Sequence, residues 1–166
     1  MAANGGRYKI AAEITSAAAV VLTLLFVGLE VREATRQTAL NTQSNQVAAY
    51  QDLISQITQF NQLLLDPQVA AVFERMTDPD GNWAEFSAVE RRQARSLLYI
   101  LVRHADMAFY QFERGMLPEE RLHSALRPLL SDMDKPIYRA FWEEASANQV
   151  PAFREYVEGR MKAAVR

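Results

Sequence analysis

Residues 10–29 read IAAEITSAAAVVLTLLFVGL, and the first charges after this apolar stretch are Glu30, Arg32, Glu33 and Arg36. Residues 14–29 carry no charge at all. Twenty helical residues rise about 1.5 Å each and extend about 30 Å, which matches the thickness of the hydrocarbon core of a bilayer. We therefore predict that residues 10–29 form a single transmembrane helix.

Two other interpretations of this stretch remain open. A cleaved signal peptide fits the basic residues Arg7 and Lys9, although the apolar run is long and no convincing cleavage site follows it. A buried or interfacial helix fits the short uncharged part and the carboxylate of Glu13. The positive-inside rule does not orient the helix, because Arg7 and Lys9 on one side balance Arg32 and Arg36 on the other.

Small residues follow one face of the predicted transmembrane helix, at Ala12, Ser16, Ala19 and Thr23. Such a stripe lets helices approach closely in lipid, although the same residues are also tolerated in a helix without a partner. Glu13 lies about one turn inside the stretch, so its carboxylate either reaches the headgroups or marks a pathway or a partner.

The composition limits the class of protein. About 130 residues follow the predicted span, which is enough for one domain with a core. The net charge of −2 argues against a general nucleic-acid binder, which would present a basic face. The chain contains no Cys, and this excludes thiolate catalysis and cysteine-ligated metal.

The chain divides into four predicted parts. We expect a disordered tail over residues 1–9, the transmembrane helix over residues 10–29, an extended juxtamembrane helix over residues 30–65, and a helical domain over residues 66–166 that packs on it. The transmembrane helix should continue into the juxtamembrane helix, because residues 30–65 contain neither Pro nor Gly.

Apolar residues of the juxtamembrane helix alternate at spacings of three and four, which makes a heptad seam of Tyr50, Leu53, Ile57, Phe60 and Leu64. A parallel self-association through this seam would explain its polar and nearly uncharged flanks. The alternative is that the seam packs on the later helices of the same subunit.

Residues that are typical of helix starts and helix ends recur in the rest of the chain. Asp66 and Pro67 suit the start of a short helix, and Ser87 with Glu90 makes a capping box that opens the strongest helix, over residues 87–114. Gly115 ends that helix. Further starts fall at Pro118, Pro136 and Pro151. No stretch alternates as a strand would, so we predict an all-α fold in which the long N-terminal helix is followed by a small helical bundle.

No catalytic, cofactor or metal site has a persuasive spacing, and we expect the protein not to be an enzyme. Asp78, Asp80 and Asn82 are similar to part of a calcium loop, but the twelfth position holds Val89 instead of Glu. His104 borders the apolar face of its helix, where we expect a capped or partly exposed side chain and not a ligand.

Two polar surfaces on the helix over residues 87–114 remain as candidates. One polar stripe is a possible groove, formed by Tyr99, Arg103, Asp106 and Tyr110. A basic patch could touch lipid phosphates, and it consists of Arg91, Arg92 and Arg95. In both cases a solvated helix face is the simpler interpretation.

Four segments carry a resemblance: AVVLTLLFVGLEVREATRQTA, FYQFERGMLPEERL, YRAFWEE and AFREYVEGRM. With them the chain resembles a group of bacterial single-span membrane proteins that have a small C-terminal helical domain and no established activity. The shared element after the span is Tyr110, Arg114 and Gly115. The resemblance covers most of residues 10–163 and implies a bacterial inner-membrane location with the helical domain in the cytoplasm.

Three functions fit these observations. The first is a membrane-anchored helical protein without catalysis that self-associates or serves as an accessory or scaffold subunit of a membrane complex. The second is a homo-oligomeric channel or transport-like assembly, with Glu13, Ser16 and Thr23 facing a lumen. The third is a small-molecule sensor that uses the possible groove. The expected partners are the lipid bilayer and either a second copy or another membrane protein, without nucleic acid.

Overall fold

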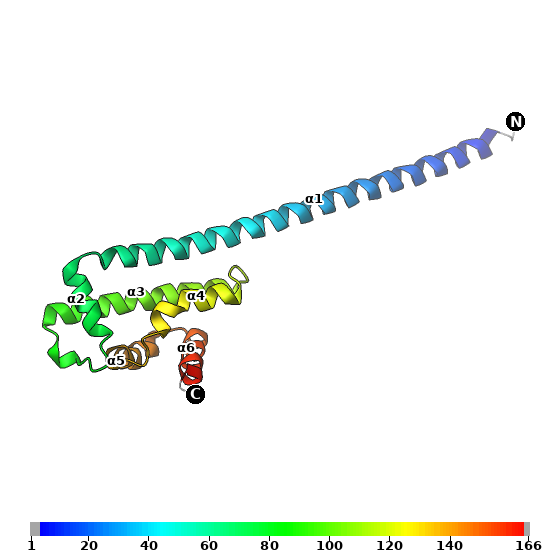
Figure 1. The fold of residues 1–166 in the computed structure, drawn as a ribbon. Coiled ribbons are helices and arrows are strands. Elements are labelled where there is room, and N and C mark those ends of the chain that lie inside the picture. Colours follow the sequence, from blue (N-terminus) through cyan, green and yellow to red (C-terminus); the bar gives the residue numbers. More distant parts are fainter. Residues whose placement is uncertain (1–3, 165–166) are drawn as a thin grey trace. The chain divides into compact units, whose positions relative to one another are not determined.

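The computed structural model describes residues 4–164, apart from the side chains of residues 4–12, 14, 15, 17, 18 and 164. Within this range the fold is all-helical, as predicted, and contains no strand. Figure 1 shows its elements, which are α1 (Asn4–Leu63), α2 (Pro67–Met76), the short 3₁₀ turn η1 (Trp83–Glu85), α3 (Ala88–Glu113), α4 (Glu119–Leu130), α5 (Pro136–Ala145), the 3₁₀ turn η2 (Ser146–Asn148) and α6 (Pro151–Ala164).

Two compact units make up the chain, Met1–Ser44 and Asn45–Arg166, and α1 contributes residues to both. The tail predicted over residues 1–9 overlaps the beginning of α1 at Asn4, and residues 1–3 lie outside the described range. The helix then continues through residues 30–63, where no Pro or Gly interrupts its hydrogen bonds.

In the first unit, every described side chain of residues 13–44 is exposed. Large apolar side chains occupy all sides of the helix between Val20 and Val31, with exposed fractions from 46% to 66%. Among the described residues, no helix carries an apolar stretch of the length that crossing a membrane requires. Part of the predicted span, the side chains of residues 10–12, 14, 15, 17 and 18, lies outside the described range.

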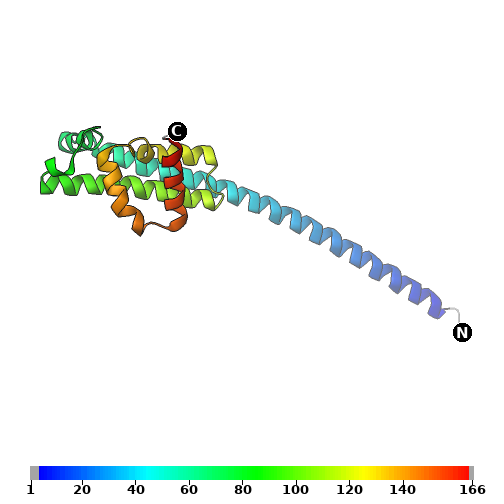
Figure 2. The same ribbon diagram turned by 90° about the horizontal axis from the view of Figure 1, so that it is seen from below.

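The second unit is a helical bundle with α3 at its centre. α3 packs against α2, α4 and α5, and α4 also packs against α6. Figures 1 and 2 show α3 and α4 side by side. Each of the helices α2 to α6 contributes a fully buried side chain to one shared core, for example Met76, Leu98, Leu122, Ile137 and Phe153. The ring of Trp142 meets that of Phe153 edge to face at 6.2 Å.

Local signals begin and end these helices at the predicted residues. The Asp66 carboxylate accepts two backbone N–H bonds at the start of α2, where Pro67 occupies the first turn. Ser87 and Glu90 form the reciprocal bonds of a capping box at the start of α3. Gly115 follows α3 with a φ of +69°, a conformation that a side chain with a Cβ adopts only with strain.

The part of α1 that belongs to the second unit supplies core residues. Leu53 and Phe60 are 2% and 4% exposed, while Tyr50 and Ile57 lie half-buried against the same cluster. The Phe60 ring meets the ring of Phe73 in α2 edge to face at 5.8 Å. These side chains therefore pack on the core of their own subunit, as one of the two interpretations of the heptad seam predicts. Self-association through the seam stays a prediction.

Candidate functional site

A groove of about 410 Å³ lies between the end of α1 and the middle of α3, and we call it the α1–α3 groove. From α1 it is lined by Gln56, Gln59, Phe60 and Leu63. From α3 it is lined by Tyr99, Ile100, Arg103 and His104. All of these residues belong to the second unit. The volume lies within the range of about 300–1,000 Å³ that is typical of small-molecule sites.

Helical periodicity explains why these residues share one groove. On both helices the lining positions recur at spacings of three and four, so each set forms a stripe along one face. Phe60 is almost fully buried at 4% exposed, whereas Leu63, Tyr99 and Ile100 are 37–45% exposed. The Tyr99 ring packs edge to face on Phe141 of α5 at 4.8 Å, which holds it in place. The lining is therefore mainly apolar and partly open.

His104 is the buried polar residue of the α1–α3 groove. Its side chain is 5% exposed, so the expectation of a partly exposed histidine is wrong. Its Nδ1 has no hydrogen-bond partner within the described chain. Burial lowers the pKa of His104 below the ordinary value of 6.5, because the charged ring would lose its hydration, and the ring is neutral at pH 7. The sequence does hold the signal for its burial, because Leu101 and Ala108 lie at helical spacing on the same inward face.

Arg103 supplies the charge of the groove. Its side chain is 67% exposed, and its guanidinium lies 3.3 Å from the Asp106 carboxylate one turn away. An exposed ion pair of this kind stabilises a protein by only about 0–1 kcal/mol. None of the lining residues is Asp or Glu, so Arg103 is the charged residue of the lining and Asp106 lies beside it.

The predicted groove residues are only partly brought together. Tyr99 and Arg103 line the α1–α3 groove, and Asp106 contacts it through Arg103. Tyr110 does not line it, because its ring lies under the Arg114 guanidinium at 5.1 Å. The contribution of α1 to this groove could not be predicted from the sequence, since no local pattern shows which face of α3 the end of α1 approaches.

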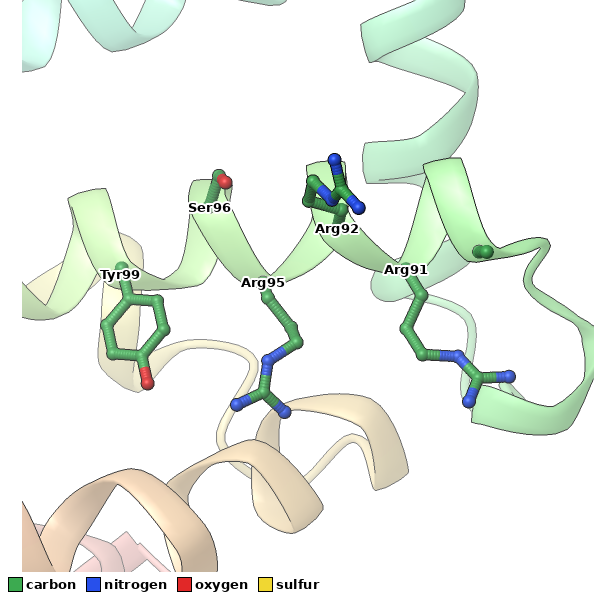
Figure 3. A pocket seen from close by; sticks show the side chains of 6 residues that line it. Arg91, Arg92, Arg95, Ser96 and Tyr99 are labelled. Atoms are coloured by element: carbon green, nitrogen blue, oxygen red, sulfur yellow. The ribbon is translucent and has the colours of Figure 1, made fainter.

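The basic patch forms a second hollow, of about 570 Å³, along the first half of α3 (Figure 3). Arg95 donates two hydrogen bonds to Glu144, at 2.7 and 2.8 Å, and these bonds lower the pKa of that carboxyl. Arg91 donates to two backbone carbonyl groups, of residues 83 and 86. Arg92 lines the same hollow, and Figure 3 shows its side chain pointing away from those of Arg91 and Arg95. The three guanidinium groups therefore do not converge on one anion.

The candidate residues of the predicted span are exposed where their side chains are described, and these are Glu13, Ser16, Ala19 and Thr23. The side chain of Ala12 lies outside the described range. The Thr23 hydroxyl donates to the carbonyl oxygen of Ala19 at 2.8 Å. Its donor is thus satisfied within the helix, which leaves a small and nearly apolar surface at this position.

Within the described residues, no group of three or more His, Cys, Asp or Glu side chains is arranged to hold a metal ion. The loop that is similar to part of a calcium site is a set of local turns. The Asp78 carboxylate accepts from the Asp80 N–H at 2.9 Å, and the Asn82 amide oxygen accepts from the Ala84 N–H at 2.9 Å.

No protein-family model matches the chain, and no match is found among curated proteins or solved structures. Function is therefore inferred from this chain's own side chains and exposed surfaces.

Proposed function

We propose that this chain is a membrane-anchored helical protein that acts without catalysis, as a self-associating or accessory subunit of a membrane complex. Its anchor is the helix over residues 10–29, in the inner membrane of a bacterium, and its helical domain faces the cytoplasm. The observation that carries the proposal is the exposed apolar surface of α1 between Val20 and Val31.

An amphipathic helix buries one stripe and leaves the other face in water, but this segment has no polar face. Eight of its large side chains, between Val20 and Leu29, point in all directions around the helix, and each is at least 46% exposed. Soluble monomers rarely expose apolar patches larger than about 300–600 Å². In a bilayer, lipid acyl chains contact all sides of such a helix at once. The apolar surface on all sides therefore supports the proposed membrane anchor.

Charge substitutions within the apolar segment test the anchor. Leu22→Arg combined with Leu25→Arg should release the protein from the membrane, because each arginine at the centre of a span costs about 2.5–3.5 kcal/mol. Alkaline carbonate extraction of the membrane fraction, followed by detection of the protein in the pellet, measures the release. Thr38→Arg combined with Asn41→Arg is the matched control, with the same spacing on the exposed part of α1, and it should stay in the pellet. Extraction of the unmodified protein into the soluble fraction would contradict the anchor.

A single cysteine tests the cytoplasmic placement, since the chain has no native Cys. Val89 is 68% exposed at the start of α3, so Val89→Cys should leave the bundle intact. A membrane-impermeant maleimide should label this variant only after the inner membrane is opened. Labelling in cells whose outer membrane alone is permeable would place the domain on the other side.

The stripe of small residues is the proposed surface for self-association. Ser16→Leu combined with Ala19→Leu should convert a discrete oligomer into a monomer, because bulky side chains keep helix backbones apart. Val21→Phe combined with Leu25→Phe enlarges the opposite face and serves as the control. Analytical ultracentrifugation in detergent gives the mass of each variant. An oligomer that persists after the stripe substitutions would contradict self-association through this surface. A monomeric unmodified protein would favour an accessory subunit over a self-associating one.

A further inference from the structure

We infer that the α1–α3 groove binds a small carboxylate that has an apolar or aromatic body. The body packs against Phe60, Leu63 and Ile100, and the carboxylate group pairs with Arg103. Anchoring and self-association make no use of this groove, so the inference goes beyond the proposed function and stands independently of it.

The shape and lining of the groove favour an apolar body. Phe60 forms part of the wall from α1, and the partly exposed side chains of Leu63 and Ile100 lie at the opening. Apolar surface that a ligand removes from water at these side chains favours binding. Tyr99, held against Phe141, adds an ordered aromatic wall, so little side-chain entropy is lost on binding.

The positive charge of Arg103 favours an anionic ligand over a cationic one. Arg103 is a cationic lining residue, and no acidic side chain lines the groove. Its single contact with Asp106 is 3.3 Å long and leaves most of the guanidinium N–H donors available. A carboxylate suits these donors because guanidinium and carboxylate form two parallel hydrogen bonds. An ammonium group at the same position would meet like charge.

His104 lines the same groove and is 5% exposed, so its ring lies close to any ligand that enters. Its Nδ1 atom is closed off from solvent, so an oxygen of a ligand in the groove does not reach that atom. The ring therefore reports on a bound ligand and does not bind it.

The test uses the full chain in lipid nanodiscs and follows the imidazole ring protons by nuclear magnetic resonance. The chain has two histidines, and His123→Gln assigns the remaining signal to His104. Phenylpropionate should shift the His104 signal saturably and leave the His123 signal unchanged. Phenylpropylamine, which has the same body and the opposite charge, should give no saturable shift. Equal effects of the two probes, or no saturable effect of phenylpropionate, would overturn the inference.

Variants locate the binding and separate it from a structural effect. Arg103→Gln should weaken phenylpropionate binding about tenfold through loss of the charge-assisted pair. Asp106→Asn should tighten it instead, because it frees the Arg103 guanidinium from its competing carboxylate. Ile100→Trp should abolish binding by filling the groove, while its circular dichroism stays that of the unmodified protein. Arg92→Gln removes an equal charge outside the groove and should change nothing. Binding that tolerates Ile100→Trp, or that Arg92→Gln weakens as much as Arg103→Gln, would contradict this site.

Discussion

At the scale of single residues, the bundle buries three polar side chains among those described, His104, Gln111 and Gln149. The Gln149 amide donates to the carbonyl oxygen of Ala145 at 3.1 Å, so its nitrogen is satisfied. Other buried atoms of these residues lack partners in the described chain, namely His104 Nδ1, Gln111 Oε1 and Gln149 Oε1. Each unpaired buried atom lowers the free energy of unfolding, and the burial of apolar neighbours offsets this loss.

Burial of His104 makes the stability of the bundle depend on pH. Its folded-state pKa is lower than the ordinary value of 6.5. As pH falls through 6.5, the unfolded chain therefore binds a proton before the folded chain does, and the free energy of unfolding decreases. The decrease ends only below the folded-state pKa. We expect His104→Gln to remove this decrease, as measured by urea unfolding and circular dichroism at about pH 7.5 and about pH 5.5.

The second histidine provides the control for this prediction. The His123→Gln variant should keep the decrease in stability, because it leaves the buried His104 in place. A decrease that persists in full in the His104→Gln variant would show that another group causes it.

At the scale of helices, the sequence predicts the ends of elements well because the causes are local. Asp66 and Pro67 begin α2, Ser87 caps α3, and Gly115 follows its last turn, each through bonds or dihedral angles within a few residues. Pro136 and Pro151 begin α5 and α6 for the same reason. The all-α class and the order of these helices follow from such signals alone.

The pairing between helices could not be predicted in the same way. Arg95 binds Glu144 across 49 positions, and the Arg121 guanidinium donates to the Tyr50 hydroxyl across 71 positions at 3.0 Å. Periodicity indicates which face of a helix is apolar, but it does not indicate which partner covers that face. The α1–α3 groove depends on such a long-range pairing, so the sequence locates only the half of it that belongs to α3.

Two glycines should respond in opposite directions to the same substitution. Gly115→Ala should lower the free energy of unfolding by about 1 kcal/mol, because its positive φ strains a residue with a Cβ. Gly159→Ala, inside α6, should raise it by about 0.5–1 kcal/mol through helix propensity. An added Cβ meets no atom within 4 Å at either position, so the backbone alone decides the sign. Urea unfolding midpoints measure both, and shifts in the same direction would contradict this account.

At the scale of the whole chain, the sequence predicts a helical domain over residues 66–166 that packs on the helix before it. Buried residues of α1 lie in the described core of the second unit, among them Ala49, Leu53 and Phe60. The second unit accordingly begins at Asn45. The last turns of α1 therefore form part of the bundle and do not merely lead to it.

Two truncations test this boundary. Removal of residues 1–44 should leave a cooperatively unfolding protein, because no described core side chain lies among them. Removal of residues 1–65 should lower the free energy of unfolding by more than about 3 kcal/mol, because it empties the sites of Leu53 and Phe60. Urea unfolding of both proteins gives the comparison. Equal stability of the two would show that α1 contributes nothing to the bundle.

Trp142, which contacts Phe153 edge to face in the core, makes unfolding of the bundle observable by tryptophan fluorescence. The chain has two tryptophans, Trp83 and Trp142, and both lie in the second unit. Trp142 is 4% exposed, and its emission should move to longer wavelengths when the core opens to water. Because residues 1–44 contain no tryptophan, fluorescence excited selectively at tryptophan follows the bundle alone. Unfolding of the bundle can therefore be observed without a dye while the long N-terminal helix remains in detergent, in lipid or against a partner.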